Sequence, residues 1–94
     1  MLQSDNYEVS TKSLLAITFN DEDWKWVQDL CLDLINHPND ILSRLAVTCL
    51  GHIARIHGQI DKEKVLKALK EKMRDKKIAG YVEDAISDIQ MFAN

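Results

Sequence analysis

Cysteine and histidine are the residues whose spacing first points to chemistry, because thiolates and imidazoles bind zinc. Cys49 and His52 are three residues apart and can share one face of a helix, with His57 and Cys31 as further candidates. The paired CxxC or HxxxH spacings of structural zinc sites are absent from the sequence. We therefore expect no bound metal, two buried reduced thiols, and a His57 that interacts favourably with the negative end of its helix.

Carboxylates offer a second kind of candidate site. Asp29 and Asp33 are four residues apart, so a helix would place them on one face, where a carboxylate pair can bind a metal or transfer protons. No histidine or carboxylate motif stands opposite them, and no serine lies in a Gly-rich loop or at a strand-to-helix elbow. A small metal-dependent enzyme is therefore the least favoured class of function, and we expect neither a catalytic site nor a cofactor.

The composition is that of a small globular helical domain. The chain has 94 residues, enough for one domain, of which 46% are hydrophobic and 29% charged. It contains 3 glycines and 1 proline, which favours long helices. A net charge of −3 argues against direct nucleic-acid binding and is compatible with a basic protein partner, or with solubility alone. Reduced cysteines, with no secretory signal and no long apolar run, favour a cytoplasmic protein without membrane contact.

Apolar periodicity predicts five helices and no sheet, with residues 1–9 frayed. The expected helices span residues 10–19, 23–36, 41–58, 61–74, and 78 or 80 to 92. The expected caps are Ser10 or Thr11, Asp40 and Gly58. The segment 41–58 is the most apolar, so we expect a central helix with neighbours on at least two sides.

The inward faces follow from the same periodicity. The buried face of the central helix should consist mainly of Leu42, Ala46, Cys49, Leu50, Ile53 and His57. On either side of this main stripe, the face should be widened by Leu45, Ile56 and Ile41. The last helix should turn Phe92 inward. Gly51 either permits close approach of a neighbouring helix or is a tolerated cost of about 1 kcal/mol relative to alanine.

The chain also contains an internal repeat, in which the pattern of apolar residues recurs without residue identity. The helix pair 23–36 and 41–58 is followed by the pair 62–74 and 78–92, and a shift of 36 residues overlays Leu42 on Ile78 and Leu50 on Ile86. The string His37-Pro38-Asn39-Asp40, with Leu42, Leu45-Ala46 and Cys49-Leu50-Gly51 after it, resembles the second helix of a HEAT repeat. The second unit departs at Ser87, where that family has glycine. The resemblance implies two HEAT-like antiparallel hairpins plus an N-terminal helix, which is a short all-α solenoid.

A longer resemblance runs from Trp24-Lys25-Trp26-Val27-Gln28 through the segment 49–57. It is similar to small bacterial HEAT-like immunity proteins of contact-dependent growth-inhibition and other polymorphic toxin systems. The resemblance covers about residues 21–92 and implies a protein that binds a cognate toxin domain and covers its active site. That domain is expected to be basic and a ribonuclease or other nuclease. The alternative is a HEAT-type adaptor or assembly factor with no toxin role.

The residues expected to bind a partner lie on several helices. Trp24 and Trp26 are two residues apart, so a helix sends them to opposite sides, and a buried Trp24 leaves Trp26 outward beside Asp29 and Asp33. An exposed tryptophan flanked by carboxylates suits a basic partner, unless the first helix packs over it. The remaining expected partner-binding residues are Asp23, Arg55, Asp84 and Asp88. The basic run from Lys62 to Lys77 is expected to be a solvated face.

Overall fold

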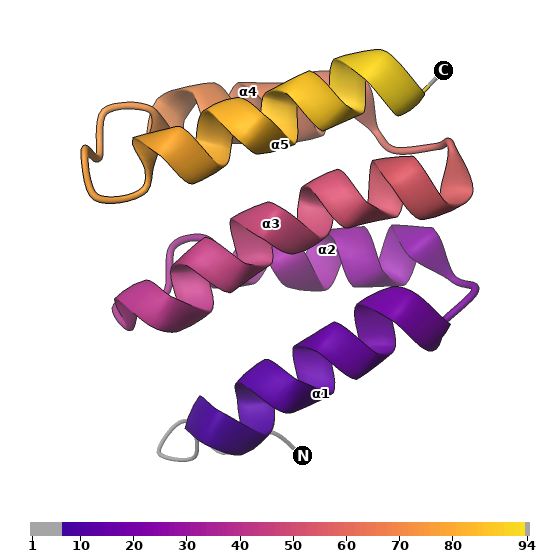
Figure 1. The fold of residues 1–94 in the computed structure, drawn as a ribbon, viewed down its shortest axis with the longest axis horizontal. Helices are drawn as coiled ribbons and strands as arrows, with labels where there is room; N and C mark the ends of the chain where they lie inside the picture. Colours follow the sequence, from indigo (N-terminus) through magenta and orange to yellow (C-terminus); the bar gives the residue numbers. More distant parts are fainter. Residues whose placement is uncertain (1–6, 94) are drawn as a thin grey trace.

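The fold is a two-layer arrangement of helices. The computed structural model describes the backbone of residues 7–93 and the side chains of residues 12–93. This part of the chain forms five α-helices and no strand: α1 (Tyr7–Asn20), α2 (Trp24–Leu34), α3 (Asp40–His57), α4 (Lys62–Lys72) and α5 (Ala79–Phe92). Helices α1, α3 and α5 lie side by side in one layer, and α2 and α4 lie behind them (Figure 1). The Cα extents of 35 × 32 × 16 Å are those of a flat slab, and the predicted all-α fold is confirmed.

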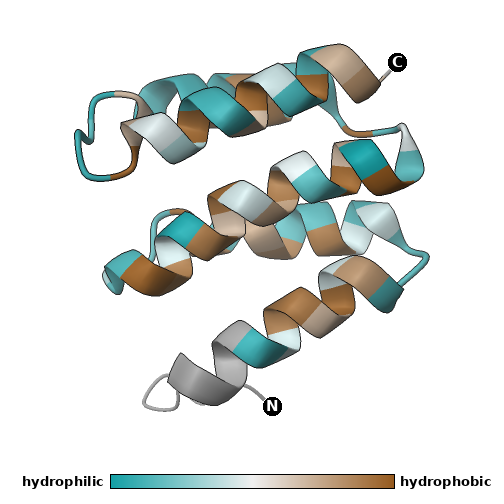
Figure 2. Cartoon of the chain, in the orientation of Figure 1, coloured by the Kyte–Doolittle hydropathy of each residue, from teal (hydrophilic) through white to brown (hydrophobic). Residues whose placement is uncertain are grey.

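Helix α3 is the centre of the packing. It contacts α1 and α5 within its own layer and α2 in the other layer. The apolar residues of its main stripe, which include Ala46, Cys49 and Ile53, are buried, and Leu14, Val27 and other apolar side chains pack into the same core. Figure 2 shows apolar and hydrophilic segments alternating along each helix, as the periodicity of a partly buried helix requires. The expectation of a central helix with neighbours on at least two sides is confirmed.

The ends of α3 are set by local backbone chemistry. Asn39 is the N-cap, because its side-chain oxygen accepts a hydrogen bond from the Leu42 N–H at 3.0 Å. Asp40, the predicted cap, instead lies in the first turn, where its charge suits the positive helix end. At the other end Gly58 has φ of 64° and its N–H bonds to the Ala54 carbonyl, as predicted for a glycine that terminates a helix.

Other helix boundaries differ from the expected ones. Helix α1 begins at Tyr7, so Ser10 and Thr11 are inside it and do not cap it, while residues 1–6 of the expected frayed segment lie outside the described residues. Helix α2 ends at Leu34 rather than residue 36. The Ser43 hydroxyl donates to the Ile35 carbonyl at 2.6 Å, which satisfies a carbonyl group that a longer helix would bond internally. The same early stop occurs in α4, which ends at Lys72 instead of residue 74.

Three apolar side chains that were expected to be buried are exposed. Ile41, Ile56 and Phe92 expose 62%, 44% and 43% of their surface, and the core instead contains Val47 and Ala54. The physical reason is the position of α5, which lies against the side of α3 that carries Gly51 and so moves the buried sector away from Ile41 and Ile56. His57 is only partly buried.

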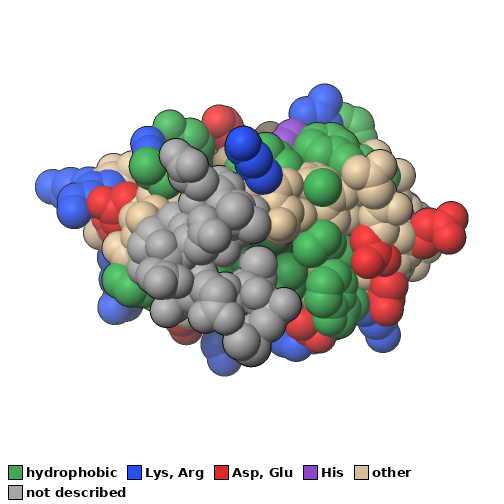
Figure 3. Space-filling model, turned by 90° about the horizontal axis from the view of Figure 1, so that it is seen from below, with side chains coloured by type: hydrophobic (Ala, Val, Ile, Leu, Met, Phe, Trp, Pro, Cys, Tyr) green, Lys and Arg blue, Asp and Glu red, His purple; other side chains and the backbone are tan. Residues whose placement is uncertain are grey.

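Helix α1 forms one edge of its layer. Leu14 and Thr18 face inward and are buried, while Leu15 and Phe19 are exposed. Seen from below, where α1 lies, the molecule has apolar side chains at its surface (Figure 3). Within residues 7–93, no helix has both the length and the apolar character that crossing a bilayer requires.

Candidate functional site

Helices α3 and α5 approach closely at Gly51. A Cβ atom added there would lie 3.0 Å from Asp88 Oδ2 and 3.4 Å from the Ala85 Cα. The glycine therefore permits close helix packing, which is the first of the two interpretations that the sequence allowed. The two helices lie side by side in the front layer (Figure 1), and their close contact creates a continuous surface that we call the front face, the side of the α1–α3–α5 layer turned away from α2 and α4.

Aromatic rings and basic side chains pair along the front face. The Arg44 guanidinium lies 5.4 Å from the centre of the Tyr81 ring and donates to the Tyr81 hydroxyl at 3.4 Å. The Arg55 guanidinium lies 5.5 Å from the centre of the Phe92 ring. Both contacts are cation–π interactions between α3 and α5, and they hold rings that would otherwise move freely at the surface.

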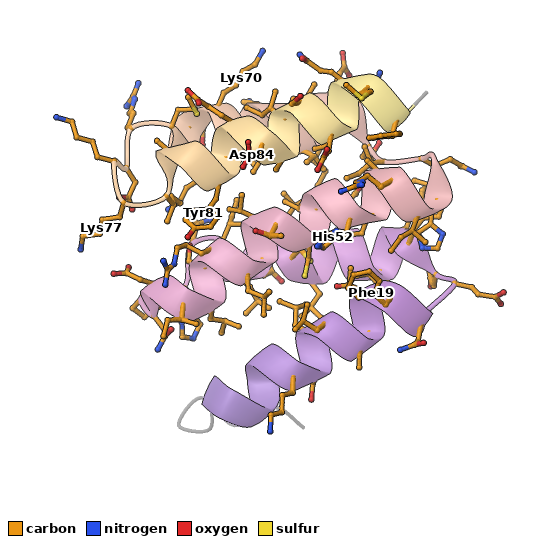
Figure 4. The ribbon with its side chains drawn as sticks, in the orientation of Figure 1. Phe19, His52, Lys70, Lys77, Tyr81 and Asp84 are labelled. Atoms are coloured by element: carbon orange, nitrogen blue, oxygen red, sulfur yellow. The ribbon has the colours of Figure 1, made fainter. Side chains whose placement is uncertain are left out.

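A third ring pairs with α3 from the other side. The Phe19 ring, near the end of α1, lies 5.0 Å from the His52 imidazole at an angle of 44°. Figure 4 shows Phe19 and His52 close together between α1 and α3, with Tyr81 between α5 and α3 and Asp84 on α5. One row of side chains on α3 therefore meets aromatic residues from both of its neighbours.

A hollow of about 310 Å³ lies between the two cation–π contacts. Its walls come from α3 and α5 and consist of Thr48, His52, Arg55, Tyr81, Asp84, Ala85 and Asp88. Burial and the positive charge of Arg55 lower the pKa of His52, against the opposing effect of Asp88, so the imidazole is uncharged at neutral pH. Rings, carboxylates and a guanidinium group together make this surface suited to binding a polar partner.

The hollow contains three of the seven residues expected to bind a partner. Arg55, Asp84 and Asp88 line it together. The other four, Trp26, Asp23, Asp29 and Asp33, are on α2 or at its start, in the second layer. The seven residues therefore do not form one continuous surface, because the helix pairs place α2 and α5 in different layers of the slab.

The α2 residues form part of a different surface, which we call the back face, the exposed side of α2 and α4. Trp26 exposes 49% of its surface, so α1 does not pack over it and its expected outward position is confirmed. Asp29 forms a salt bridge with Lys64 of α4 at 3.2 Å, and hydrogen bonds from Lys64 and Gln28 lower the pKa of the Asp29 carboxyl. Asp23 is the N-cap of α2 and accepts from the Trp26 N–H at 3.3 Å. Two of the four residues thus have contacts within the fold.

A buried amide joins α2 to α4 beneath this face. Gln28 is 1% exposed, and its side-chain oxygen accepts the Asp61 N–H at 2.7 Å. Its nitrogen donates to Asp61 Oδ2 at 3.5 Å and to Asp29 Oδ1 at 3.4 Å. Gln28 therefore satisfies the backbone N–H of Asp61, the N-cap residue of α4, whose own side chain forms no capping hydrogen bond.

The two cysteines lie in the core between α2 and α3. Cys31 and Cys49 are both 0% exposed and free, which confirms their expected burial. A hydrogen bond with Cys49 and burial raise the pKa of the Cys31 thiol far above its usual range. His52 faces Phe19 at the surface instead of joining the thiols, and no group of three or more potential metal ligands forms among the described side chains.

Five residues of the front face were missed by sequence reasoning: Phe19, Arg44, His52, Tyr81 and Phe92. The sequence did contain a signal for an exposed face on each helix. Arg44, His52 and Arg55 recur at helical spacing on α3, and Tyr81, Asp84 and Asp88 do so on α5. The pairing between the two rows was not predictable, since it depends on the register of α3 against α5. Relatives do not supply that register either: no protein-family model, curated protein or solved structure matches the chain.

Proposed function

We propose that this protein is a stoichiometric protein-binding module and that the front face meets its partner. The observation that carries the proposal is the row of exposed rings, each held by a side chain of α3. Phe19, Tyr81 and Phe92 expose 53%, 43% and 43% of their surface. Tyrosine and arginine are enriched among the residues that dominate interface energies. A ring already held in place loses little conformational freedom when a partner covers it.

The narrower form of the proposal is that the partner is a bacterial toxin domain and this chain its immunity protein. Support comes from the HEAT-like and immunity-like residues between positions 21 and 92. One contact between helices also supports a repeat arrangement, since Arg44 and Tyr81 are 37 residues apart, within one residue of the 36-residue shift of the internal repeat. Stacked repeats bring equivalent positions of successive units together in this way. A net charge of −3 suits a basic partner such as a nuclease.

The mechanism in this proposal is coverage of the toxin without turnover. The broad front layer excludes substrate sterically, while complementary charge increases the rate of association and orients the complex. A HEAT-type adaptor would use the same surface on a different partner, and the chain's own residues favour the toxin only through the resemblance.

Co-expression tests the identity of the partner. An immunity gene is expected to follow the gene of its toxin directly, so the C-terminal domain of the protein encoded upstream is expressed in cells with and without this protein, and survival is measured. We expect survival only with the protein present, and a 1:1 complex after purification. Cell death in its presence, with no complex formed, would reject the immunity function and leave the adaptor as the better proposal.

Two alanine variants test which face binds. Tyr81→Ala removes a ring from the front face, and Trp26→Ala removes one of similar exposure from the back face. We expect Tyr81→Ala to weaken the toxin complex by about 10-fold or more and Trp26→Ala to change it by less than about 2-fold, as measured by calorimetry. The opposite ranking would move the binding surface to α2.

A further inference from the structure

The two carboxylates in the hollow form no salt bridge or hydrogen bond with the side chains that the structure describes. Among the described residues, the salt bridges join Lys64 to Asp29 and Lys77 to Asp40, and neither Asp84 nor Asp88 takes part in a salt bridge or hydrogen bond. Both line the hollow from α5, where their spacing of four residues places them on one face of the helix. Their negative charge is therefore directed toward whatever enters.

Two arginines of α3 on the same face have their guanidinium groups in contact with aromatic rings. Arg44 and Arg55 place their guanidinium groups over the rings of Tyr81 and Phe92, at 5.4 and 5.5 Å from the ring centres. His52 is uncharged at neutral pH and faces Phe19. The hollow thus contains two carboxylates against one guanidinium that lines its wall, which leaves it negative overall.

We propose that the hollow between α3 and α5 receives a cationic side chain, arginine or lysine, that projects from the surface of the protein partner. This inference rests on the proposed protein-binding function and deepens it by stating the chemistry of the contact. The Asp84 and Asp88 carboxylates accept hydrogen bonds from the cation, and the aliphatic stem packs against the Tyr81 ring at the rim. The volume of about 310 Å³ accommodates one long side chain.

Charge complementarity selects this occupant over others. An acidic side chain would meet two unneutralised carboxylates, and an apolar one would bury them without hydrogen bonds. A metal ion would find too few ligands, since the described residues of the hollow contribute two carboxylates and His52 is turned to Phe19. A basic partner surface satisfies the two carboxylates and keeps the existing cation–π contacts intact.

The first test uses the toxin domain as the ligand. Asp84→Asn and Asp88→Asn keep the size of each side chain and remove its charge, and Glu71→Gln makes the same change at an exposed position of α4 as a control. We expect each front-face variant to weaken the complex by about 10-fold, the double variant by more, and the control by less than about 2-fold. If the toxin domain binds and Tyr81→Ala weakens it, but the double Asn variant binds as tightly as the native protein, then the cation inference is wrong and the proposed function survives.

The second test needs no partner. Blocked arginine, N-acetylarginine N-methylamide, is titrated into the ¹⁵N-labelled protein at millimolar concentration, with the blocked lysine as a second probe and the blocked citrulline as an uncharged analogue of arginine. We expect amide shifts concentrated at residues 81–88 of α5 and 48–55 of α3 with arginine or lysine, and none with citrulline. Equal shifts with citrulline, shifts spread over the acidic residues of α2, or shifts that persist in the double Asn variant would each overturn the inference, whether or not a toxin partner is found.

Discussion

Between α3 and α5 the helices meet directly at Gly51, whereas between α2 and α4 the main link is a side chain, the buried amide of Gln28. The charges differ in the same way. On the back face Asp29 pairs with Lys64, and on the front face the carboxylates of Asp84 and Asp88 form no salt bridge or hydrogen bond with any residue that the structure describes. The comparison shows that net charge alone does not identify a binding surface. What distinguishes the front face is that its arginines contact rings and leave its acids available.

The largest expected effect comes from closing the space at the α3–α5 contact. In Gly51→Val the new side chain meets the Ala85 backbone at a point where even a Cβ atom would be tight, so the helices must separate. We expect a loss of about 3 kcal/mol in the free energy of unfolding, measured by urea denaturation. The matched control is Gly80→Ala, because nothing lies within 4 Å of a Cβ added there. Comparable losses in both variants would show that the close contact is not the cause.

A smaller effect is expected at the α2–α4 link. Gln28→Leu keeps the buried volume roughly constant but leaves the Asp61 N–H without its acceptor. We expect a loss of about 1 to 3 kcal/mol in stability, together with faster amide exchange at the start of α4 while α3 and α5 stay protected. Gln90→Leu, an exposed position on α5, is the control. Unchanged exchange at the start of α4 would contradict the assigned role of Gln28.

The smallest effect concerns the pH dependence of the front face. The pKa of His52 is lowered from its ordinary value of 6.5, so below that pH the unfolded chain binds more protons than the folded protein. Stability should therefore decrease as the pH falls from 6.5 toward the lowered pKa, and His52→Gln should flatten that part of the profile. Removing one cause of the shift with Arg55→Gln should raise the pKa of His52, as followed by NMR titration. A His52 pKa of 6.5 or higher in the native protein would contradict the prediction.

Much of the fold was predictable because helix formation and burial leave local signals in this chain. The periodicity identified each helix, Gly58 identified the end of α3, and the position of Trp24 relative to Trp26 indicated which ring faces outward. The errors occurred where a neighbour decides the outcome. Asn39 and Asp40 are both good caps, and only the actual backbone geometry distinguishes them.

The candidate site was predictable only in part for a related reason. Arg55, Asp84 and Asp88 were expected at a surface, but their common location depends on how α3 and α5 align. That alignment also determines the Arg44–Tyr81 and Arg55–Phe92 contacts. Periodicity indicates which side of a helix is polar, and it carries no information about what the polar side meets.

The hydrogen bond from the Ser43 hydroxyl to the Ile35 carbonyl has a consequence for the order of folding. It joins residues only 8 apart in the chain and lies at the corner where α2 turns into α3. Closing so short a loop costs little chain entropy, so the α2–α3 corner can assemble early and serve as a nucleus. Helix α5, whose partners on α3 lie 37 residues away, then docks onto a surface that is already formed. In this order the hollow is completed only when α5 docks, because α3 and α5 together supply its walls.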